Sequence, residues 1–452
     1  MFDVLILGGT VVDGTGKKGY RADVGITGEK IDAIGDLSQA EARRVIVAHG
    51  LTISPGFIDT HAHSDGMLLL DPQHANGLRQ GITTELLGQD GLSYAPLSPE
   101  NYKMYSWYLS GLLGLPPRDL DMRDVTAFRA NYHKRCAVNT AYCVAHGAIR
   151  LSTVGFHDAP LTGDALKKAK KLVRESIEQG AVAFSTGMSY YPNCWSTTDE
   201  LVELCTSAKE AGGLYVTHLR DVNTDRGFGG GGVAEAIEIG RRTGVKVHFS
   251  HFRTLPESAG EVAALMAPVD KAKKAGLECM LELYPYPIGS SFAAMFLPPK
   301  YQEGGPDAIL KRLKDKAGRP ALGKAIEKAS VRPLEMFVFT NLPRTPELEG
   351  MSLPDIAAQR KLPLGETICE LMVENNLQVG FRGAPPHSVA VTRQLARDQM
   401  ELLARPDYMV GSDAIPVGGL PHPRAYGCFP RFIGRYSKIA PDVMNLETMI
   451  QR

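Results

Sequence analysis

Two patterns of hydrophobic and polar positions divide the chain near residue 54. Residues 1–54 contain short segments in which apolar and polar side chains alternate, separated by turns such as Gly8-Gly9 and Asp13-Gly14. A period of two is typical of strands with one buried face, and glycines are typical of the turns between them. This part of the chain therefore predicts a small β domain with an antiparallel sheet.

From residue 55 onward, short apolar runs that end in polar residues alternate with amphipathic helices. The clearest helices are Ala165–Gln179, Asp199–Ala211 and Val233–Thr243. The apolar runs predict strands at residues 55–61, 83–87, 138–145, 181–186, 214–218, 245–251, 278–284 and 407–412. This rhythm predicts a (β/α)8 barrel over residues 55–452, an α/β fold whose active site lies at the carboxyl ends of the strands.

One stretch, from about residue 291 to residue 400, is longer than a single strand–helix unit needs. Proline and glycine pairs punctuate it, at Pro298-Pro299, Gly304-Gly305 and Pro385-Pro386. Such residues mark turns and breaks between elements. The stretch predicts an insertion with helices of its own, placed as a lid over the barrel.

Two histidines flank one alanine at the end of the first barrel strand, in Asp59-Thr60-His61-Ala62-His63. Because strand side chains alternate between faces, His61 and His63 point the same way. Both imidazoles can then reach one metal ion. Taken alone, the pair fits ordinary polar loop residues equally well.

Similar residues recur at the ends of other predicted strands. Asp90 follows the second strand, His218 ends the fifth, His251 the sixth, and Asp413 the eighth. These ends meet at one rim of a barrel, and imidazole and carboxylate are ligands that zinc favours. A single histidine is more often a hydrogen-bonded core residue, but their joint recurrence predicts one or two divalent ions, with zinc fitting best.

Composition and charge limit the other functional classes. Fifty basic residues balance fifty acidic ones, so the net charge is zero and gives no reason to expect nucleic acid or an anionic membrane as partner. No apolar run approaches the roughly 18 residues of a membrane span, and no signal segment is evident. The seven scattered cysteines form no Cys-x-x-Cys pair, which favours a reducing, cytoplasmic location.

The motifs carry a resemblance to known enzymes. The residues Pro55–His63, Thr217-His218, Ser250-His251 and Gly411-Ser412-Asp413 resemble the amidohydrolase superfamily. A narrower resemblance, to the N-acyl-D-amino-acid deacylase (D-aminoacylase) family, is carried by Ser185–Met188 with Tyr190 and Pro192, Tyr284–Tyr286 with Gly289-Ser290, and Pro421–Gly427 with Phe429–Arg431. The resemblance implies a metal-dependent barrel beside a small β-sandwich built from both chain ends, and hydrolysis of an N-acyl bond on a D-amino acid.

The resemblance also implies roles for individual residues. His218 and His251 match the histidines at a tightly bound zinc, and His61 and His63 match the pair at a second, weaker site. Asp413 matches the catalytic aspartate. The positions that match substrate contacts are Arg424, which would grip the substrate carboxylate, together with Tyr190, Tyr284, Ser290 and Arg253.

The chain departs from this family at three points. Asp90 stands where the family has a metal-bridging cysteine, which leaves the number and preference of metals open because carboxylate is a harder ligand. Arg253 replaces a lysine, which changes reach and geometry. The chain ends at Arg452, within an expected helix over residues 446–452. The family's closing strands are then missing, so residues 1–54 would expose sheet edges. Two explanations fit this expectation: a partner chain covers the edges, or the sequence is a shortened form.

These residues suggest a mechanism. A divalent ion lowers the pKa of bound water from about 15.7 to about 7, and the resulting hydroxide attacks an amide carbonyl. Asp413 can take the proton of that water and deliver it to the leaving nitrogen as general acid/base. Other interpretations exist for these residues: Gly411-Ser412-Asp413 as a turn or cap, Arg424 as a structural ion pair, and Tyr190 and Tyr284 as packed core residues.

Two other functions compete with deacylation of a small-molecule substrate. A cyclic amide hydrolase, such as a hydantoinase or dihydroorotase, usually has a metal-bridging lysine on strand four. The predicted fourth strand, Ala181–Thr186, has no lysine. A non-catalytic relative that uses the barrel for assembly is the other alternative, and retention of the histidines and Asp413 speaks against it. The sequence allows a homo-oligomer and does not define the acyl group or side chain of the substrate.

Overall fold

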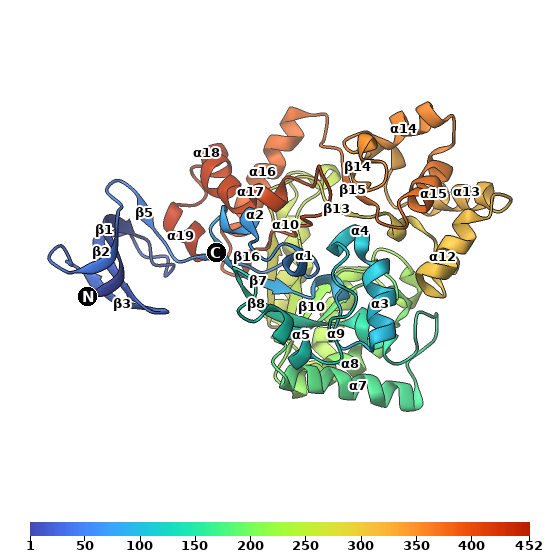
Figure 1. The fold of residues 1–452 in the computed structure, drawn as a ribbon, viewed down its shortest axis with the longest axis horizontal. Helices are drawn as coiled ribbons and strands as arrows, with labels where there is room; N and C mark the ends of the chain where they lie inside the picture. The colour runs from blue at the N-terminus through green and yellow to red at the C-terminus, as the bar shows by residue number, and fades with distance from the viewer.

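The computed structural model describes all residues from 1 to 452 (Figure 1). A small sheet from the N-terminal residues stands at one end of the molecule, a barrel occupies the middle, and the helices of the insertion lie at the other end. None of the helices combines the length and apolar character needed to cross a bilayer.

The N-terminal sheet has five strands in the order β3-β2-β1-β4, with β5 paired to β1. The strands are β1 (Phe2–Val11), β2 (Tyr20–Thr27), β3 (Lys30–Gly35), β4 (Ala42–Val47) and β5 (Thr52–Ile53). The prediction of an antiparallel sheet is confirmed for β1, β2 and β3. It is wrong for β4 and β5, which run parallel to β1. Residues 36–41 cross from the β3 edge of the sheet to the β4 edge. Because of this crossing, β4 runs in the same direction as β1.

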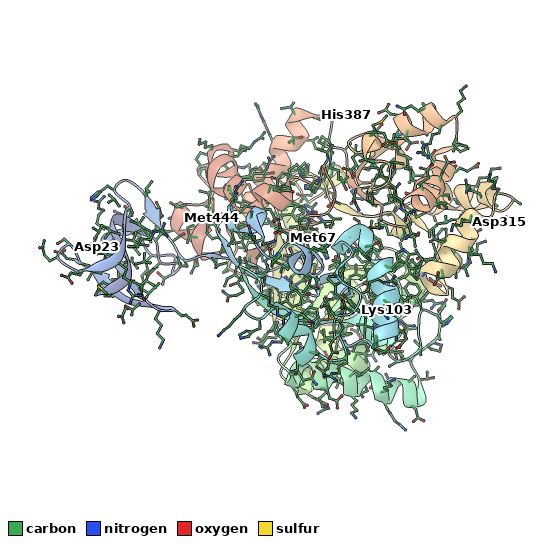
Figure 2. The ribbon with its side chains drawn as sticks, in the orientation of Figure 1. Asp23, Met67, Lys103, Asp315, His387 and Met444 are labelled. Atoms are coloured by element: carbon green, nitrogen blue, oxygen red, sulfur yellow. The ribbon has the colours of Figure 1, made fainter.

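One carboxylate supports this crossing. Asp23, labelled in Figure 2, lies on β2 and is largely buried. Its two oxygens accept hydrogen bonds from the backbone N–H groups of Gly8 at 2.7 Å and Leu37 at 2.9 Å. The side chain thus links β1 to the crossing segment.

The eight predicted barrel strands are confirmed. They form one parallel sheet in the order β16-β12-β11-β10-β9-β8-β7-β6. The strands are β6 (Phe57–Asp59), β7 (Ile82–Leu87), β8 (Asn139–Ala145), β9 (Ala183–Gly187), β10 (Leu214–His218), β11 (Val247–Phe249), β12 (Cys279–Leu283) and β16 (Tyr408–Val410). An isolated parallel bridge between Ala62 and Ala414, just past β6 and β16, brings the two ends of the sheet together.

Helices surround this sheet and supply the outer half of its core. They are α1 (Met67–Leu70), α2 (Ala75–Leu78), α3 (Pro99–Tyr108), α4 (Ser110–Leu113), α5 (Val125–Tyr132), α6 (His146–Leu151), α7 (Gly163–Glu178), α8 (Thr198–Glu210), α9 (Gly232–Thr243), α10 (Val262–Lys274), α16 (Val389–Leu403), α17 (Arg424–Arg431), α18 (Ser437–Ile439) and α19 (Leu446–Gln451). In α7 the residues Ala169, Val173 and Ile177 recur every four positions and are buried, which is the stripe expected of a helix with one covered face.

The insertion builds a second, antiparallel sheet, in the order β13-β15-β14. Its elements are β13 (Ser290–Phe292), α11 (Pro299–Gln302), α12 (Gly305–Lys314), α13 (Arg319–Ala329), β14 (Phe337–Asn341), α14 (Leu353–Arg360), α15 (Leu364–Glu374) and β15 (Gly380–Gly383). The aromatic rings of Phe296, Phe337 and Phe381 pack with centroids 4.6–5.0 Å apart. The next helix, α16, packs on β12 and β16 and belongs to the barrel; His387, labelled in Figure 2, lies in the loop that leads to it.

The last helix, α19, connects the small sheet to the barrel. Glu447 accepts a hydrogen bond from the backbone N–H of Gly19 at 3.1 Å, and Gln451 donates one to the carbonyl of Thr15 at 3.1 Å. On the other side, the carbonyl of Arg452 accepts from the N–H of Val410 on β16 at 3.4 Å. The predicted helix over residues 446–452 thus links the β1–β2 turn with the eighth barrel strand.

Candidate active site

His61 and His63 lie directly after β6, where a buried carboxylate fixes the backbone. Asp59 has no exposed surface, and its Oδ1 accepts hydrogen bonds from the N–H groups of His61 at 3.2 Å and Ser412 at 2.7 Å. The two imidazoles point to one place, with their Nε2 atoms 3.3 Å apart. The sequence-based expectation that both side chains face the same way agrees with this arrangement.

Asp90 occupies the tight turn after β7, at the centre of the group. Its φ of 56° lies in the left-handed region, which aspartate tolerates better than most residues. Its Oδ2 lies 3.5 Å from Nε2 of His63 and 3.5 Å from Nδ1 of His218, and its Oδ1 lies 3.7 Å from Nε2 of His61. The preceding Gly88 allows this turn, because a Cβ there would lie 2.0 Å from the carbonyl oxygen of Cys143.

His218 and His251 approach Asp90 from the opposite side of the barrel. His218 ends β10 and His251 follows β11. Nδ1 of His218 lies 2.9 Å from Nε2 of His251, which in turn lies 3.9 Å from Oδ2 of Asp90. Four histidines from three strand ends therefore converge on one carboxylate.

Asp413 completes the group from the end of β16. It also has a positive φ, 53°. Its Oδ1 lies 3.3 Å from Nε2 of His63, while its Oδ2 lies 2.7 Å from Nη1 of Arg424. Burial alone would favour the neutral acid, but Arg424 and His63 hold the pKa of Asp413 well below its usual value, so the carboxyl group is ionised at neutral pH.

The charges of this group act strongly on each other because the site is buried. Burial opposes ionisation of Asp90, yet His61 and His218 hold its pKa well below the usual value. Burial likewise opposes protonation of His61, but Glu282 and Asp90 raise its pKa to about 10. Each shift reflects an opposite charge a few ångströms away in a medium of low dielectric constant.

The donor atoms fit a divalent ion such as zinc. Potential ligand atoms of His61, Asp90 and His251, and of His61, His63 and Asp413, all lie within 4.8 Å of one another in each set. Oδ1 of Asp90 is buried and has no hydrogen-bond partner. Two ligand atoms each about 2.1 Å from one zinc ion are about 3.4 Å apart in a tetrahedron, and the separations here are 2.9–3.9 Å.

A cavity of about 800 Å³ opens on this group. Four of the predicted substrate contacts line it, namely Tyr190, Arg253, Tyr284 and Ser290. The side chain of Arg253 donates a hydrogen bond to the Tyr284 hydroxyl at 2.7 Å, and its guanidinium carbon lies 4.1 Å from the ring centroid. His218, His251 and Asp413 also line it, so the cavity joins the candidate metal ligands to a cationic side chain.

The fifth predicted contact, Arg424, is placed differently. It begins α17, is fully buried and is not among the residues that line the cavity. Besides its ion pair with Asp413, its guanidinium carbon lies 4.6 Å from the Tyr284 ring centroid and its Nη2 donates to the carbonyl of Ser290 at 3.3 Å. Arg424 therefore contacts three cavity residues while its own first partner is the candidate catalytic aspartate.

The insertion supplies apolar side chains to the lining of the cavity. These are Met295, Phe296, Leu297, Met336, Phe337 and Phe381. The expected lid thus forms part of the cavity. A cavity lined by both apolar side chains and a cationic side chain suits a molecule that carries an anionic group and a hydrophobic group.

Sequence reasoning did not single out two residues that contact the group, Glu282 and Ser189, or a third, Asp221, that contacts Ser189. Glu282, on β12, accepts from the His61 ring at 2.7 Å. Ser189 lies 2.8 Å from Nε2 of His218, and its hydroxyl donates to Asp221. Glu282 leaves one signal in the sequence, a single charge inside the apolar run from Cys279 to Leu283; Ser189 and Asp221 lie in ordinary loop sequence and leave none.

Comparisons with known proteins identify relatives over the whole chain, although no family model matches it. The D-aminoacylase of Alcaligenes xylosoxydans xylosoxydans is 30% identical over 450 residues, which cover 97% of this chain and 79% of the relative. The N-acyl-D-glutamate deacylase of the same organism is 32% identical, covering 100% of this chain and 81% of the relative.

Solved structures give the same result. The N-acyl-D-glutamate deacylase from Bordetella bronchiseptica, complexed with zinc and a phosphonate inhibitor, has a TM-score of 0.78 at 30% identity. A D-aminoacylase described as defining a novel subset of amidohydrolases has a TM-score of 0.76 at 29% identity. Each match covers 99% of this chain and 83% of the other.

The geometry generates a prediction about metal content. Zinc-supplemented protein, dialysed against metal-free buffer, should retain at least one ion per chain by elemental analysis. Asp90→Ala should lower that content, because the Asp90 carboxylate faces all four imidazoles. Asp164→Ala, which removes an exposed carboxylate on α7, is the matched control and should retain the wild-type content. A metal-free wild-type protein, or equal content in wild type and Asp90→Ala, would contradict the assignment.

Proposed function

The chain belongs to the N-acyl-D-amino-acid deacylase (D-aminoacylase) family of amidohydrolases, and from this premise we propose that it hydrolyses the amide bond of N-acyl-D-amino acids to a carboxylic acid and a free D-amino acid. One observation carries the proposal: four imidazoles and two carboxylates converge in one group, and three members of that group, His218, His251 and Asp413, line a cavity that also holds a cationic side chain. A metal-dependent hydrolase of an anionic amide needs these groups together.

His61, His63, Asp90, His218 and His251 would hold one or two divalent ions, with zinc as the ion that suits this donor set. A bound ion of this kind supplies a nucleophilic water at neutral pH and polarises the amide carbonyl. A relative with known structure contains zinc together with a phosphonate that mimics the tetrahedral intermediate of its reaction. The presence of a carboxylate at Asp90 is compatible with such a centre.

Asp413 would move the proton. The carboxylate is ionised, and its Oδ1 lies on the side of His61 and His63, where the attacking water would be. It can therefore accept a proton from that side and return it to the departing nitrogen, because an amine leaves poorly unless it is protonated. The ion pair with Arg424 fixes the other oxygen and so the orientation of the carboxylate.

The cavity walls would orient the substrate. Arg253, Tyr284 and Ser290 line the cavity beside Arg424, and a guanidinium matches the two oxygens of a substrate carboxylate. Tyr190, whose ring lies 5.0 Å from that of His218, borders the same space. The apolar side chains from the insertion would receive the acyl group or the amino acid side chain.

The alternative functions gain no support. The fourth barrel strand, β9, contains no lysine that could bridge two metals, as a cyclic amide hydrolase of this superfamily usually requires. A purely structural role would not need ionisable groups gathered at a cavity floor. A cytoplasmic location and assembly into a homo-oligomer remain predictions from the sequence.

A substrate panel tests the proposal directly. The zinc-loaded chain is incubated with matched N-acyl-D- and N-acyl-L-amino acids, and release of the primary amine is measured. We expect hydrolysis of D-isomers well above that of L-isomers. Hydantoins and dihydroorotate serve as comparison substrates. Hydrolysis of a cyclic amide alone would replace the deacylase assignment, and inactivity on the whole panel would favour a non-catalytic role.

Substitution of Asp413 tests proton transfer. Asp413→Asn should lower kcat by about 10²- to 10⁴-fold, the usual range for a general acid–base group. Its metal content should stay close to that of the wild type, since the amide keeps one oxygen at the same place. Near-normal turnover of the variant on a substrate that the wild type hydrolyses would exclude this role.

A comparison of two arginine variants tests carboxylate binding. Arg424→Ala should lower kcat/KM for acyl amino acids by about 30-fold or more, since removal of one partner of a desolvated ion pair costs about 2–5 kcal/mol. Because Arg424 also pairs with Asp413, part of the loss should remain on an amide-capped substrate. The ratio of the two losses isolates the contact with the carboxylate.

Arg253→Ala is measured in parallel on the same two substrates. A larger carboxylate-dependent loss in Arg253→Ala than in Arg424→Ala would move the main role to the arginine that lines the cavity. Equal losses on capped and uncapped substrates in Arg424→Ala would make Arg424 a structural partner of Asp413.

A further inference from the structure

We propose that Glu282 is a positioning residue that holds the ring proton of His61 on Nδ1, so that Nε2 of His61 presents its lone pair to the metal centre. The proposal rests on the proposed function for the presence of a metal. It assigns a role to a carboxylate that lies on β12, outside the ligand set, and makes no direct contact with the cavity.

The direction of each hydrogen bond follows from the atoms involved. Oε1 of Glu282 lies 2.7 Å from Nδ1 of His61 and also 2.7 Å from the backbone nitrogen of His251. The backbone N–H can only donate, so this oxygen is an acceptor. Nδ1 of His61 must therefore carry a proton. A cation that binds His61 displaces the proton of Nε2 and leaves a neutral imidazole, with its proton on Nδ1 and its lone pair on Nε2.

The lone pair of Nε2 faces the other candidate ligands. Nε2 of His61 lies 3.3 Å from Nε2 of His63 and 3.7 Å from both Oδ1 of Asp90 and Oδ1 of Asp413. With the opposite tautomer, this position would carry an N–H group, which binds no metal. One carboxylate thus determines whether His61 can act as a ligand.

The Glu282 side chain is closely packed in this position. It has no exposed surface, and its Oε2 lies 3.4 Å from the hydroxyl of Thr60. A Cβ at Gly411 would lie 1.5 Å from the same Oε2. Residue 411 therefore has to be glycine, which explains the first residue of Gly411-Ser412-Asp413 by the space that Glu282 occupies.

The same oxygen also positions His251. By accepting the His251 N–H, Glu282 fixes the backbone of a residue with a φ of 38°, outside the usual range for a side chain of this size. Two candidate ligands from different strands are thus tied to one atom. Loss of a hydrogen-bonding partner behind a metal ligand typically lowers metal affinity by about 10- to 100-fold.

Zinc affinity, measured by competition with a chromophoric chelator, tests the proposal. Glu282→Ala removes the acceptor and should weaken zinc binding by about 10- to 100-fold. Glu282→Gln keeps an accepting oxygen for His251 and so retains the tautomer while losing the negative charge. Its affinity should fall between those of Glu282→Ala and the wild type, with the fold intact.

Glu85 provides the matched control. It is 1% exposed, lies on another barrel strand, β7, and pairs with His74, which is not a candidate ligand. Glu85→Gln and Glu85→Ala should lower the melting temperature as the Glu282 variants do, because each leaves a buried histidine without its partner. They should leave zinc affinity at the wild-type value. Equal zinc affinity in Glu282→Ala, Glu85→Ala and wild type would overturn the proposal.

The ¹⁵N NMR spectrum of histidine-labelled, zinc-loaded wild-type protein gives a second readout, with His61→Gln used for assignment. We expect a proton on Nδ1 of His61 and none on Nε2; a proton on Nε2 would overturn the proposal without any Glu282 variant. Neither readout uses a substrate. A chain that binds zinc with this tautomer but hydrolyses no acyl amino acid would contradict the proposed function and leave the role of Glu282 intact.

Discussion

The seam between the first and last barrel strands is the feature on which the candidate site depends. After β6 and β16 have ended, three hydrogen bonds continue the pairing. Ser412 donates to the Asp59 side chain at 2.7 Å, Asp413 donates to the carbonyl of His61 at 2.7 Å, and His63 donates to the carbonyl of Ala414 at 2.9 Å. These bonds bring the two histidines next to the candidate proton carrier and hold them in register. Without this closure, His61 and His63 after β6 would be separated from Asp413 after β16, and neither group would form a complete site.

The buried charges of the candidate site lower the stability of the fold. Burial of ionised groups is unfavourable unless each one has a partner, and here several carboxylates and imidazoles share a small volume. Asp413 has Arg424 and His61 has Glu282, but Oδ1 of Asp90 has no hydrogen-bond donor. Such local conflict is expected where function rather than stability has determined the residues. Binding of a cation would relieve the conflict and stabilise the folded chain.

Much of the fold and of the site could be predicted because the signals are local. Each barrel strand is an apolar run with a polar residue at its end, and parallel strands place those ends together, so residues as distant as His61 and Asp413 could be expected to meet. Contacts made by a residue within a strand were not predictable. The sequence shows a charge at Glu282 but does not show which groups donate hydrogen bonds to it. The burial of Arg424 depends on how α17 packs, and the parallel pairing of β4 depends on a crossing that six ordinary residues make.

The ligand set contains nitrogen and oxygen atoms but no sulfur. A thiolate is the metal ligand that peroxide oxidises, first to sulfenic and then to sulfinic and sulfonic acid. Imidazole and carboxylate groups do not follow this route, and zinc itself has no redox chemistry. With Asp90 at this position, all seven cysteines of the chain lie outside the ligand set, and six of them are buried. A centre built in this way can keep its ligands under oxidative stress that would damage a thiolate-bridged centre.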